Sequence, residues 1–288
     1  MSTAVAPLPR RLAALVRIEH TVFALPFAYA GALLAVDGWP GWPDMIWITV
    51  AMTGARTLAM ALNRLADAGL DARNPRTASR ELPTGALSRS QVIALSVAAL
   101  AVFLVAVFQL DPIVRWLWPI PVAMFFVYPY LKRFTWLCHL WLGACLGLAP
   151  VGAWLGVTGE APWEAWVLGG GVVLWVAGFD LFYSLFDLEH DRHEGLHSWA
   201  VRFGDRGAFY GARAFHAGAV LLLVLVGLGL NLGSAYWLGV VATAALLGYE
   251  HAIVRPGDLR RLNAAFFTVN GVISIVFMAF VALEVAGP

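Results

Sequence analysis

The stretch EAWVLGGGVVLWVAGFDLFYSLFD, residues 164–187, is apolar over a length that can cross a lipid bilayer. It carries no charge between Glu164 and Asp180, and a helix needs about 20 predominantly apolar residues to span the hydrocarbon. A water-soluble helix of this length would carry a polar face along its whole course. The stretch therefore predicts a transmembrane helix with carboxylates in its final turns.

The rest of the chain repeats this pattern. Of the 288 residues, 60% are hydrophobic and 13% are charged, whereas soluble domains have about 25% charged residues. These charges are too few to cover a soluble core. Apolar segments of spanning length lie at 18–37, 45–66, 90–110, 114–131, 137–157, 164–187, 208–230, 234–254 and 263–285. We predict an all-α membrane protein of about nine transmembrane helices and, because no long linker divides it, a single domain over residues 1–288.

Arginine and lysine residues gather in alternate connections between these segments. One set of connections holds acidic residues and a single clear cation, Arg115. The other set is rich in cations: Arg73, Arg76, Arg80, Arg89, Lys132, Arg133, Arg192, Arg202, Arg206, Arg255, Arg260 and Arg261. Because cytoplasmic connections carry the excess of Lys and Arg, we predict a multi-pass protein of the inner (cytoplasmic) membrane, with its N-terminus and its cation-rich connections in the cytoplasm. The net charge of +1 does not favour nucleic acid as a partner, and the lipid bilayer is the expected surrounding.

Two of the cytoplasmic connections begin with acidic residues inside an apolar helix. The first reads NRLADAGLDARNPRTASRELPTG, residues 63–85, and the second reads DLFYSLFDLEHDRHEGLHS, residues 180–198. In the first, Asn63, Asp67 and Asp71 recur every four residues, which places them on one face of a helix. The spacing predicts a polar stripe that leaves the membrane at its cytoplasmic side.

The second stretch has a matching set of acids. Asp187 and Asp191 repeat the spacing of four, and Asp180 lies seven residues earlier on nearly the same face. Like charges at this spacing weaken a helix, and carboxylates inside a membrane are costly, so the acids need a compensating cation.

Magnesium is the cation that this chemistry favours, because hard oxygen ligands that leave room for phosphate oxygens suit Mg²⁺. We predict that Asp67, Asp71, Asp187 and Asp191 are the catalytic residues and bind Mg²⁺ together with Asn63. Arginines follow the acids closely and can bind phosphate oxygens in a bidentate manner. The predicted diphosphate-binding arginines are Arg64, Arg73, Arg76, Arg80 and Arg192.

Two other classes of membrane protein compete with this interpretation. The sequence HEGLH at 193–197 satisfies the H-E-x-x-H pattern of zinc peptidases, but Gly195 disfavours the helix that would present both histidines, and no third ligand is evident. Buried acids also mark ion-coupled transporters, whose helices break near the membrane midplane. Here the acids lie at the cytoplasmic ends of helices, which disfavours transport.

The two acidic stretches resemble the motifs of the UbiA family of intramembrane prenyltransferases. The first, with NRxxDxxxD and the following Pro75-Arg76-Thr77, is similar to the first aspartate motif of that family, although Arg64 stands where many relatives have Asp. The second stretch is similar to the DxxxD motif of the family. Weaker similarity extends to Arg17–Pro26, to Arg56 and to Tyr128–Arg133. The residue pattern of the first motif looks most like that of 4-hydroxybenzoate polyprenyltransferases and their relatives in menaquinone synthesis.

The resemblance implies a fold and a reaction. The fold would be a ring of membrane helices around a central cavity that opens to the cytoplasm and sideways to lipid. The reaction would be Mg²⁺-dependent transfer of a polyprenyl group from polyprenyl diphosphate to an aromatic acid or phenol acceptor such as 4-hydroxybenzoate, in ubiquinone or menaquinone biosynthesis. Lys132 would add to the diphosphate-binding residues. Asp180 would bind the acceptor. Arg56 lies well inside the second apolar segment, where an isolated cation is costly. It either pairs with an acid of a neighbouring helix or faces the cavity and binds an anionic acceptor such as an aromatic carboxylate.

Overall fold

The structure is a computed structural model, and it describes residues 7–16, 23–254 and 265–287. These residues form helices and no strand. In chain order the elements are α1 (Leu8–Val16), α2 (Leu25–Val36), α3 (Trp42–Arg73), α4 (Arg89–Val107), α5 (Val114–Leu117), α6 (Pro119–Leu131), α7 (Cys138–Thr158), α8 (Trp163–Ser184), the 3-10 turn η3 (Leu185–Asp187), α9 (Leu188–His193), α10 (Trp199–Gly229), α11 (Ser234–Ile253), the π-helical turn η4 (Ala265–Val269) and α13 (Asn270–Ala286).

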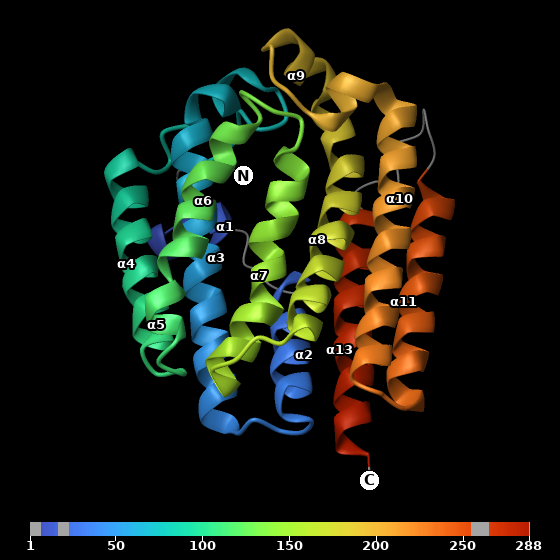
Figure 1. Cartoon of the computed structure of the whole chain (residues 1–288). Helices are drawn as coiled ribbons and strands as arrows, with labels where there is room; N and C mark the ends of the chain where they lie inside the picture. Colours follow the sequence, from blue (N-terminus) through green and yellow to red (C-terminus); the bar gives the residue numbers. More distant parts are fainter. Residues whose placement is uncertain (1–6, 17–22, 255–264, 288) are drawn as a thin grey trace.

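The long helices run side by side and alternate in direction between two ends of a bundle (Figure 1). By length and composition, six helical runs in the described part of the chain can cross a membrane: α3, α4, α7, the run Trp163–His193, α10, and Phe267–Ala286. The shorter helix α2, the α5–α6 pair and α11 complete the bundle. The prediction of an all-α membrane protein with about nine spans is confirmed.

Two predicted helices are interrupted. The segment 114–131 was expected as one span, but α5 ends at Leu117 and α6 begins at Pro119. Proline has no backbone N–H to donate to the preceding turn and clashes with its carbonyl, so it begins a helix more readily than it continues one. The helix that carries the start of the second acidic stretch is also interrupted, because the 3-10 turn η3 separates α8 from α9.

Some of the predicted features lie outside the described residues. Arg17, in the weaker part of the resemblance, is one of them, and so are the starts of the first and last predicted spans. The cations Arg255, Arg260 and Arg261 also lie there.

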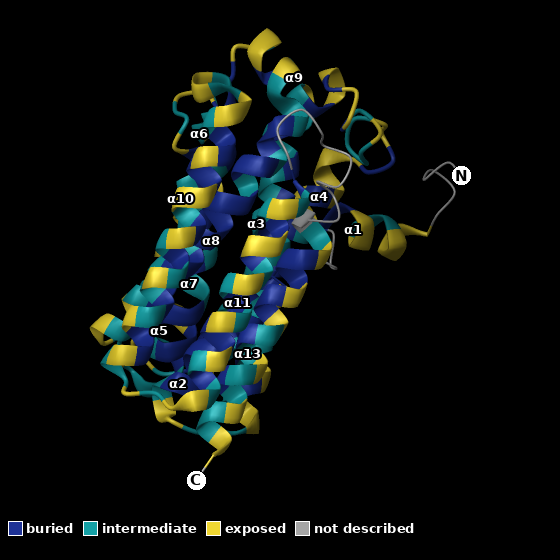
Figure 2. Ribbon diagram, turned by 90° about the vertical axis from the view of Figure 1, so that its right-hand side faces the viewer, coloured by how far each residue is buried: buried dark blue, intermediate teal, exposed yellow. Residues whose placement is uncertain are grey.

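Close approach of α7 and α8 depends on glycines on both helices. A Cβ atom at Gly147 would lie 2.7 Å from the carbonyl oxygen of Gly169, and one at Gly169 would lie 2.8 Å from that of Gly147. Small residues at such positions let membrane helices pack backbone to backbone. Buried residues lie along the inner faces of the helices, and exposed residues lie along the outside of the bundle (Figure 2). Many exposed residues are large and apolar, as at Trp116 and Val97, which suits a surface in contact with lipid.

Hydrogen bonds tie the connections together at each end of the bundle. At the end that carries α9, the His197 N–H donates to the Lys132 carbonyl at 2.6 Å, joining the α9–α10 connection to the α6–α7 connection. At the opposite end, where the C-terminus lies (Figure 1), the Asp111 N–H donates to the Gly156 carbonyl at 2.9 Å. The two acidic stretches therefore meet at one end of the bundle, beside the start of α7.

Candidate active site

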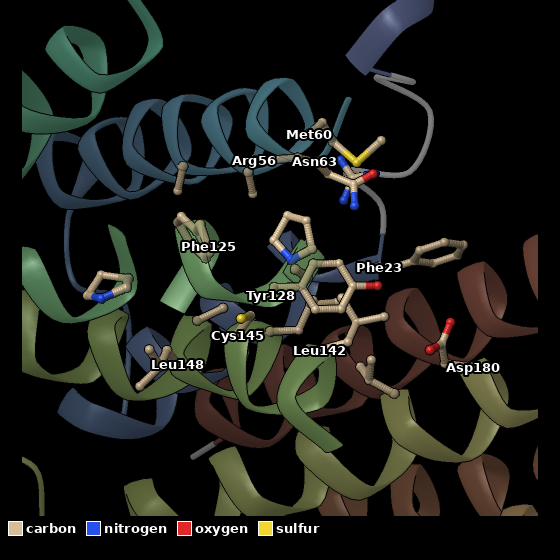
Figure 3. A pocket seen from close by; sticks show the side chains of 18 of the residues that line it. Phe23, Arg56, Met60, Asn63, Phe125, Tyr128, Leu142, Cys145, Leu148 and Asp180 are labelled. Carbon is tan, nitrogen blue, oxygen red and sulfur yellow. The ribbon is translucent and has the colours of Figure 1, made fainter. Parts of the chain in front are cut away.

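A cavity of about 690 Å³ opens inside the bundle between α3, α6, α7 and α8. Figure 3 shows Arg56 and Asn63 on α3 along one side, and Leu142, Cys145 and Leu148 on α7 along the other. Most of its charged residues lie toward the end near α9, and apart from Arg56 the remainder is mainly apolar. The charged residues that line it are five carboxylates and five cations: Asp67, Asp71, Asp180, Asp187, Asp191, Arg56, Arg64, Arg76, Arg80 and Lys132.

The predicted stripe on α3 is present. Asn63, Asp67 and Asp71 all line the cavity, and the Asn63 amide Nδ2 donates to Asp67 Oδ2 at 3.3 Å. Asp67 and Asp71 are buried. The α3 helix continues through these residues to Arg73, so the spacing of four that the sequence shows becomes one polar face.

Cations of the chain itself compensate the acids of α3. Arg133 Nη2 donates to Asp67 Oδ1 at 3.2 Å, and Lys132 Nζ lies 3.7 Å from Asp67 Oδ2. Arg80 Nη1 donates to both oxygens of Asp71, at 2.7 and 2.8 Å. The sequence predicts that a bound metal ion compensates the charge of these acids. In the structure arginine and lysine side chains supply it, and Arg133 was not among the predicted site residues.

Asp187 joins the second acidic stretch to the first. Arg76 donates to it through two nitrogens, Nε at 2.8 Å from Oδ1 and Nη2 to Oδ2, and the Asn74 amide adds a bond of 2.9 Å to Oδ1. Burial would lower the pKa of Arg76, but the hydrogen bond and charge of Asp187 outweigh it and raise that pKa. Arg76 also donates to the Tyr183 hydroxyl at 3.1 Å. The guanidinium is therefore held as a cation at the mouth of the cavity.

Of the other predicted site residues near α9, Asp191 lines the cavity, whereas Arg192 and Arg73 do not. Asp191 is buried and lines the cavity, and its side chain has no hydrogen-bond or ion-pair partner within the described residues. Arg192 instead donates to Glu189 at 3.3 Å on the exposed side of α9 and does not line the cavity. Arg73 also lies outside the cavity, where it donates to Glu194 at 2.9 and 2.7 Å. That hydrogen bond lowers the pKa of Glu194.

Asp180 lies on α8, seven residues before Asp187, and is paired with a histidine that was not among the predicted site residues. His139 Nδ1 is 2.7 Å from Asp180 Oδ2, and the backbone N–H of Trp199 donates to His139 Nε2 at 3.3 Å. Both His139 and Asp180 line the cavity, together with Tyr128 (Figure 3). A single histidine at the start of an apolar segment has no local pattern that would mark it.

Two further predicted cations and two aromatic residues of α8 also line the cavity. Arg56 and Arg64 both face the cavity, and Arg64 is buried. Phe179 and Tyr183, on α8, also line it. An electron-rich ring face can stabilise a nearby cation, so these rings suit a site in which positive charge develops.

The HEGLH sequence does not form a zinc-peptidase helix. Helix α9 ends at His193, and Gly195 adopts φ +67°, a left-handed conformation that leaves the helix. The two histidines therefore do not lie one turn apart on a continuous helix, as the zinc motif requires. The His193 side chain is 86% exposed, and it does not line the cavity.

The carboxylates of the cavity fit Mg²⁺ only if a substrate supplies further oxygen ligands. Within the described ranges, no three His, Cys, Asp or Glu side chains cluster closely enough to hold a metal ion by themselves. Magnesium commonly binds through one or two carboxylates plus the phosphate oxygens of a substrate, and rarely in a cage made only by protein. The acids at the polar end of the cavity fit Mg²⁺ in that shared form.

Comparison with known proteins agrees with this geometry. The chain matches the UbiA prenyltransferase family over residues 24–280. It is 33% identical to a 4-hydroxybenzoate octaprenyltransferase of Xanthomonas euvesicatoria, over 88% of this chain and 84% of that protein. It is 31% identical to the Marinobacter nauticus protein of the same name, over 95% and 94% of the two chains.

Solved structures share the fold. A UbiA homolog from Aeropyrum pernix K1, in its apo form, superposes with a TM-score of 0.84 at 34% identity, covering 93% of this chain and 98% of that one. A UbiA homolog from Archaeoglobus fulgidus, bound to DMAPP and Mg²⁺, has the same fold at 19% identity, with a TM-score of 0.74 and coverage of 96% and 100%. From its sequence, its fold and its helical cavity, this chain belongs to the UbiA prenyltransferase family.

Proposed function

We propose that the protein transfers a polyprenyl group from polyprenyl diphosphate to an aromatic acceptor such as 4-hydroxybenzoate, in ubiquinone or menaquinone biosynthesis. The names of the similar Xanthomonas and Marinobacter proteins support the choice of acceptor. The observation that carries the proposal is the meeting of Asp67, Asp71, Asp187 and Asp191 at the polar end of a long, mainly apolar cavity. A prenyl diphosphate likewise has a charged head and an apolar tail, so it matches the two parts of the cavity.

The charge balance of the cavity supports a divalent metal as cofactor. Five carboxylates and five cations line it, so the cavity has almost no surplus positive charge for a diphosphate. A highly charged anion enters such a surrounding only with cations of its own. Asn63 and the four aspartates Asp67, Asp71, Asp187 and Asp191 would hold Mg²⁺ together with the diphosphate. When bound, Mg²⁺ would offset the negative charge that builds on the leaving diphosphate.

The cations of the chain take part in diphosphate binding. Arg76, Arg80 and Lys132 line the polar end and each lies beside an aspartate. Once the carboxylates face a metal, these side chains can donate to phosphate oxygens, and the planar guanidinium groups can do so in a bidentate manner. They stabilise negative charge on the diphosphate as its bond to the prenyl carbon breaks.

The acceptor would bind deeper, between Arg56 and Asp180. Arg56 would pair with the carboxylate of an aromatic acid, and Asp180, oriented by His139, would accept a hydrogen bond from its phenol. The C–O bond to diphosphate breaks, and the diphosphate leaves with the electron pair. The ring carbon next to the phenol then attacks the allylic cation to form the new C–C bond, and that carbon loses its proton to the diphosphate. The apolar walls exclude water, which would otherwise capture the allylic cation.

The placement in the cell is part of the proposal. The protein is a multi-pass membrane protein, and we infer that the end carrying α9 faces the cytoplasm in the inner membrane, with the whole chain as one prenyltransferase domain. The excess of Lys and Arg in the connections at that end supports this orientation. A water-soluble acceptor and the diphosphate headgroup would then enter from the cytoplasm.

Purified protein in lipid should be incubated with Mg²⁺, a series of prenyl diphosphates and a panel of aromatic acids, and the products identified by mass spectrometry. We expect a prenylated 4-hydroxybenzoate, whose formation EDTA abolishes and a zinc-selective chelator does not. Transfer to a different acceptor would change the assigned substrate. Absence of transfer from every prenyl diphosphate would contradict the proposed reaction.

A further inference from the structure

Gly152, in the interior of α7, faces the apolar part of the cavity. A Cβ atom built at this position would meet no heavy atom within 4 Å beyond its own helix, and the residue lines the cavity. It continues the cavity face of α7 that Cys145 and Leu148 form in Figure 3, one turn beyond Leu148. Glycine weakens a helix interior relative to alanine, so its presence here needs a reason other than helix stability.

Packing explains other glycines of α7 but not this one. At Gly147 a Cβ atom would lie 2.7 Å from the carbonyl oxygen of Gly169, so the helix-to-helix contact requires glycine. At Gly156 a Cβ atom would lie 3.1 Å from the Leu110 side chain, where the start of the α4–α5 connection closes against α7. Gly152 lies one turn before this closure, and its empty surroundings are cavity.

The position lies far from the reacting groups. His139, which contacts Asp180 at the polar end, precedes Gly152 by thirteen residues on α7, or roughly 20 Å at the rise of an α-helix. A short prenyl chain bound with its diphosphate among the aspartates would end before Gly152. A long chain that continues along α7 in the same cavity would pass it.

We propose that Gly152 sets the length of prenyl chain that the protein accepts, by leaving open the part of the cavity beside the Leu110 closure. The inference rests on the proposed prenyl transfer and deepens it, because it assigns selection for long chains to one residue. A larger side chain at this position would fill the part of the cavity beside it. The diphosphate group of the substrate would keep all its contacts at the polar end. The effect should therefore depend on chain length and not on headgroup chemistry.

The test compares Gly152→Ala, Gly152→Leu and Gly152→Phe with the wild-type protein, using geranyl, geranylgeranyl and octaprenyl diphosphate. We expect the ratio of kcat/KM for octaprenyl over geranyl diphosphate to fall by about tenfold to a hundredfold in Gly152→Phe. It should fall less in Gly152→Leu and little in Gly152→Ala. Gly248→Leu is the matched control, because Gly248 lies inside α11 with no heavy atom within 4 Å of a built Cβ but does not line the cavity.

A second measurement separates this inference from the proposed reaction. Binding of the same three diphosphates is followed by the rise in Tm of the detergent-solubilised protein, which reports affinity without turnover. Gly152→Phe should lose the Tm rise with octaprenyl diphosphate and keep that with geranyl diphosphate. Equal responses to all chain lengths, or equal losses for short and long chains, would overturn the role of Gly152. Length-dependent binding without product in the wild-type protein would instead contradict the proposed reaction alone.

Discussion

His139 Nδ1 lies 2.7 Å from Asp180 Oδ2, while His139 Nε2 accepts the backbone N–H of Trp199 at 3.3 Å. A backbone N–H can only donate, so Nε2 must be the unprotonated nitrogen and Nδ1–H must donate to the carboxylate. The first residue of α10 thus selects the neutral tautomer of His139. The imidazole orients Asp180 without neutralising it, and the other carboxylate oxygen remains available to a ligand in the cavity.

Replacement of His139 should therefore impair use of the acceptor. A hydrogen bond to a charged group contributes about 1.5–3 kcal/mol, so His139→Ala should lower kcat/KM for the aromatic acceptor by about tenfold to a hundredfold. KM for prenyl diphosphate should change little, because its headgroup binds nearer α9. His139→Gln keeps an N–H donor and should recover most of the loss. Equal losses for both substrates in both variants would assign His139 a structural role only.

Replacement of Arg56 should also affect the acceptor more than the prenyl diphosphate. It lines the cavity on the same face of α3 as Asn63 but two turns further from the end of the bundle that carries α9. Arg56→Ala should raise KM for an acceptor with a carboxylate by about tenfold or more, and should affect a phenol without a carboxylate far less. Steady-state kinetics with the paired acceptors measures this difference. A similar rise in KM for both acceptors would contradict carboxylate binding by Arg56.

The orientation can be checked with single cysteines in a protein from which Cys138 and Cys145 have been removed. His193→Cys is on the exposed side of α9, and Glu160→Cys is exposed in the connection between α7 and α8. We expect a membrane-impermeant maleimide added outside intact cells or spheroplasts to label Glu160→Cys and to spare His193→Cys until the membrane is opened. The reverse labelling would place the site on the other side of the membrane.

The fold and part of the site could be predicted because their signals are local. Apolar length marks the membrane helices, and a spacing of four places Asn63, Asp67 and Asp71 on one face wherever the helix continues. The break at Pro119 could also have been predicted, since proline favours the start of a helix. The 3-10 turn Leu185–Asp187 before α9 has no comparable signal, because it contains neither proline nor glycine.

The partners of the acids depend on tertiary structure and could not be predicted from spacing. Arg76 and Asp187 are far apart in sequence, and their pairing requires the α3–α4 connection to fold across the end of α8. The same holds for Arg133 beside Asp67 and for His139 beside Asp180. Arg192 is the opposite case, in which nearness in sequence misleads. It is next to Asp191 in the chain, which predicts a shared role, but on α9 its side chain pairs with Glu189.

We propose that the acids at the polar end act on the diphosphate through a bound metal. Asp191 tests it well, because its side chain is buried in the cavity lining without a partner in the described residues, so Asp191→Asn removes charge but breaks no ion pair. Glu189→Gln is the control, an exposed acid on the same helix that does not line the cavity. Asp67→Asn tests the α3 side, where loss of the pairs with Arg133 and Lys132 should also lower Tm modestly.

The decisive measurement is the single-turnover rate of prenyl transfer by Asp191→Asn as a function of Mg²⁺ concentration, with Tm recorded on the same sample. We predict a fall of about a hundredfold to a thousandfold with Tm unchanged, partly reversed at high Mg²⁺, and a normal rate for Glu189→Gln. A near-normal rate in Asp191→Asn and Asp67→Asn at low Mg²⁺ would contradict the account.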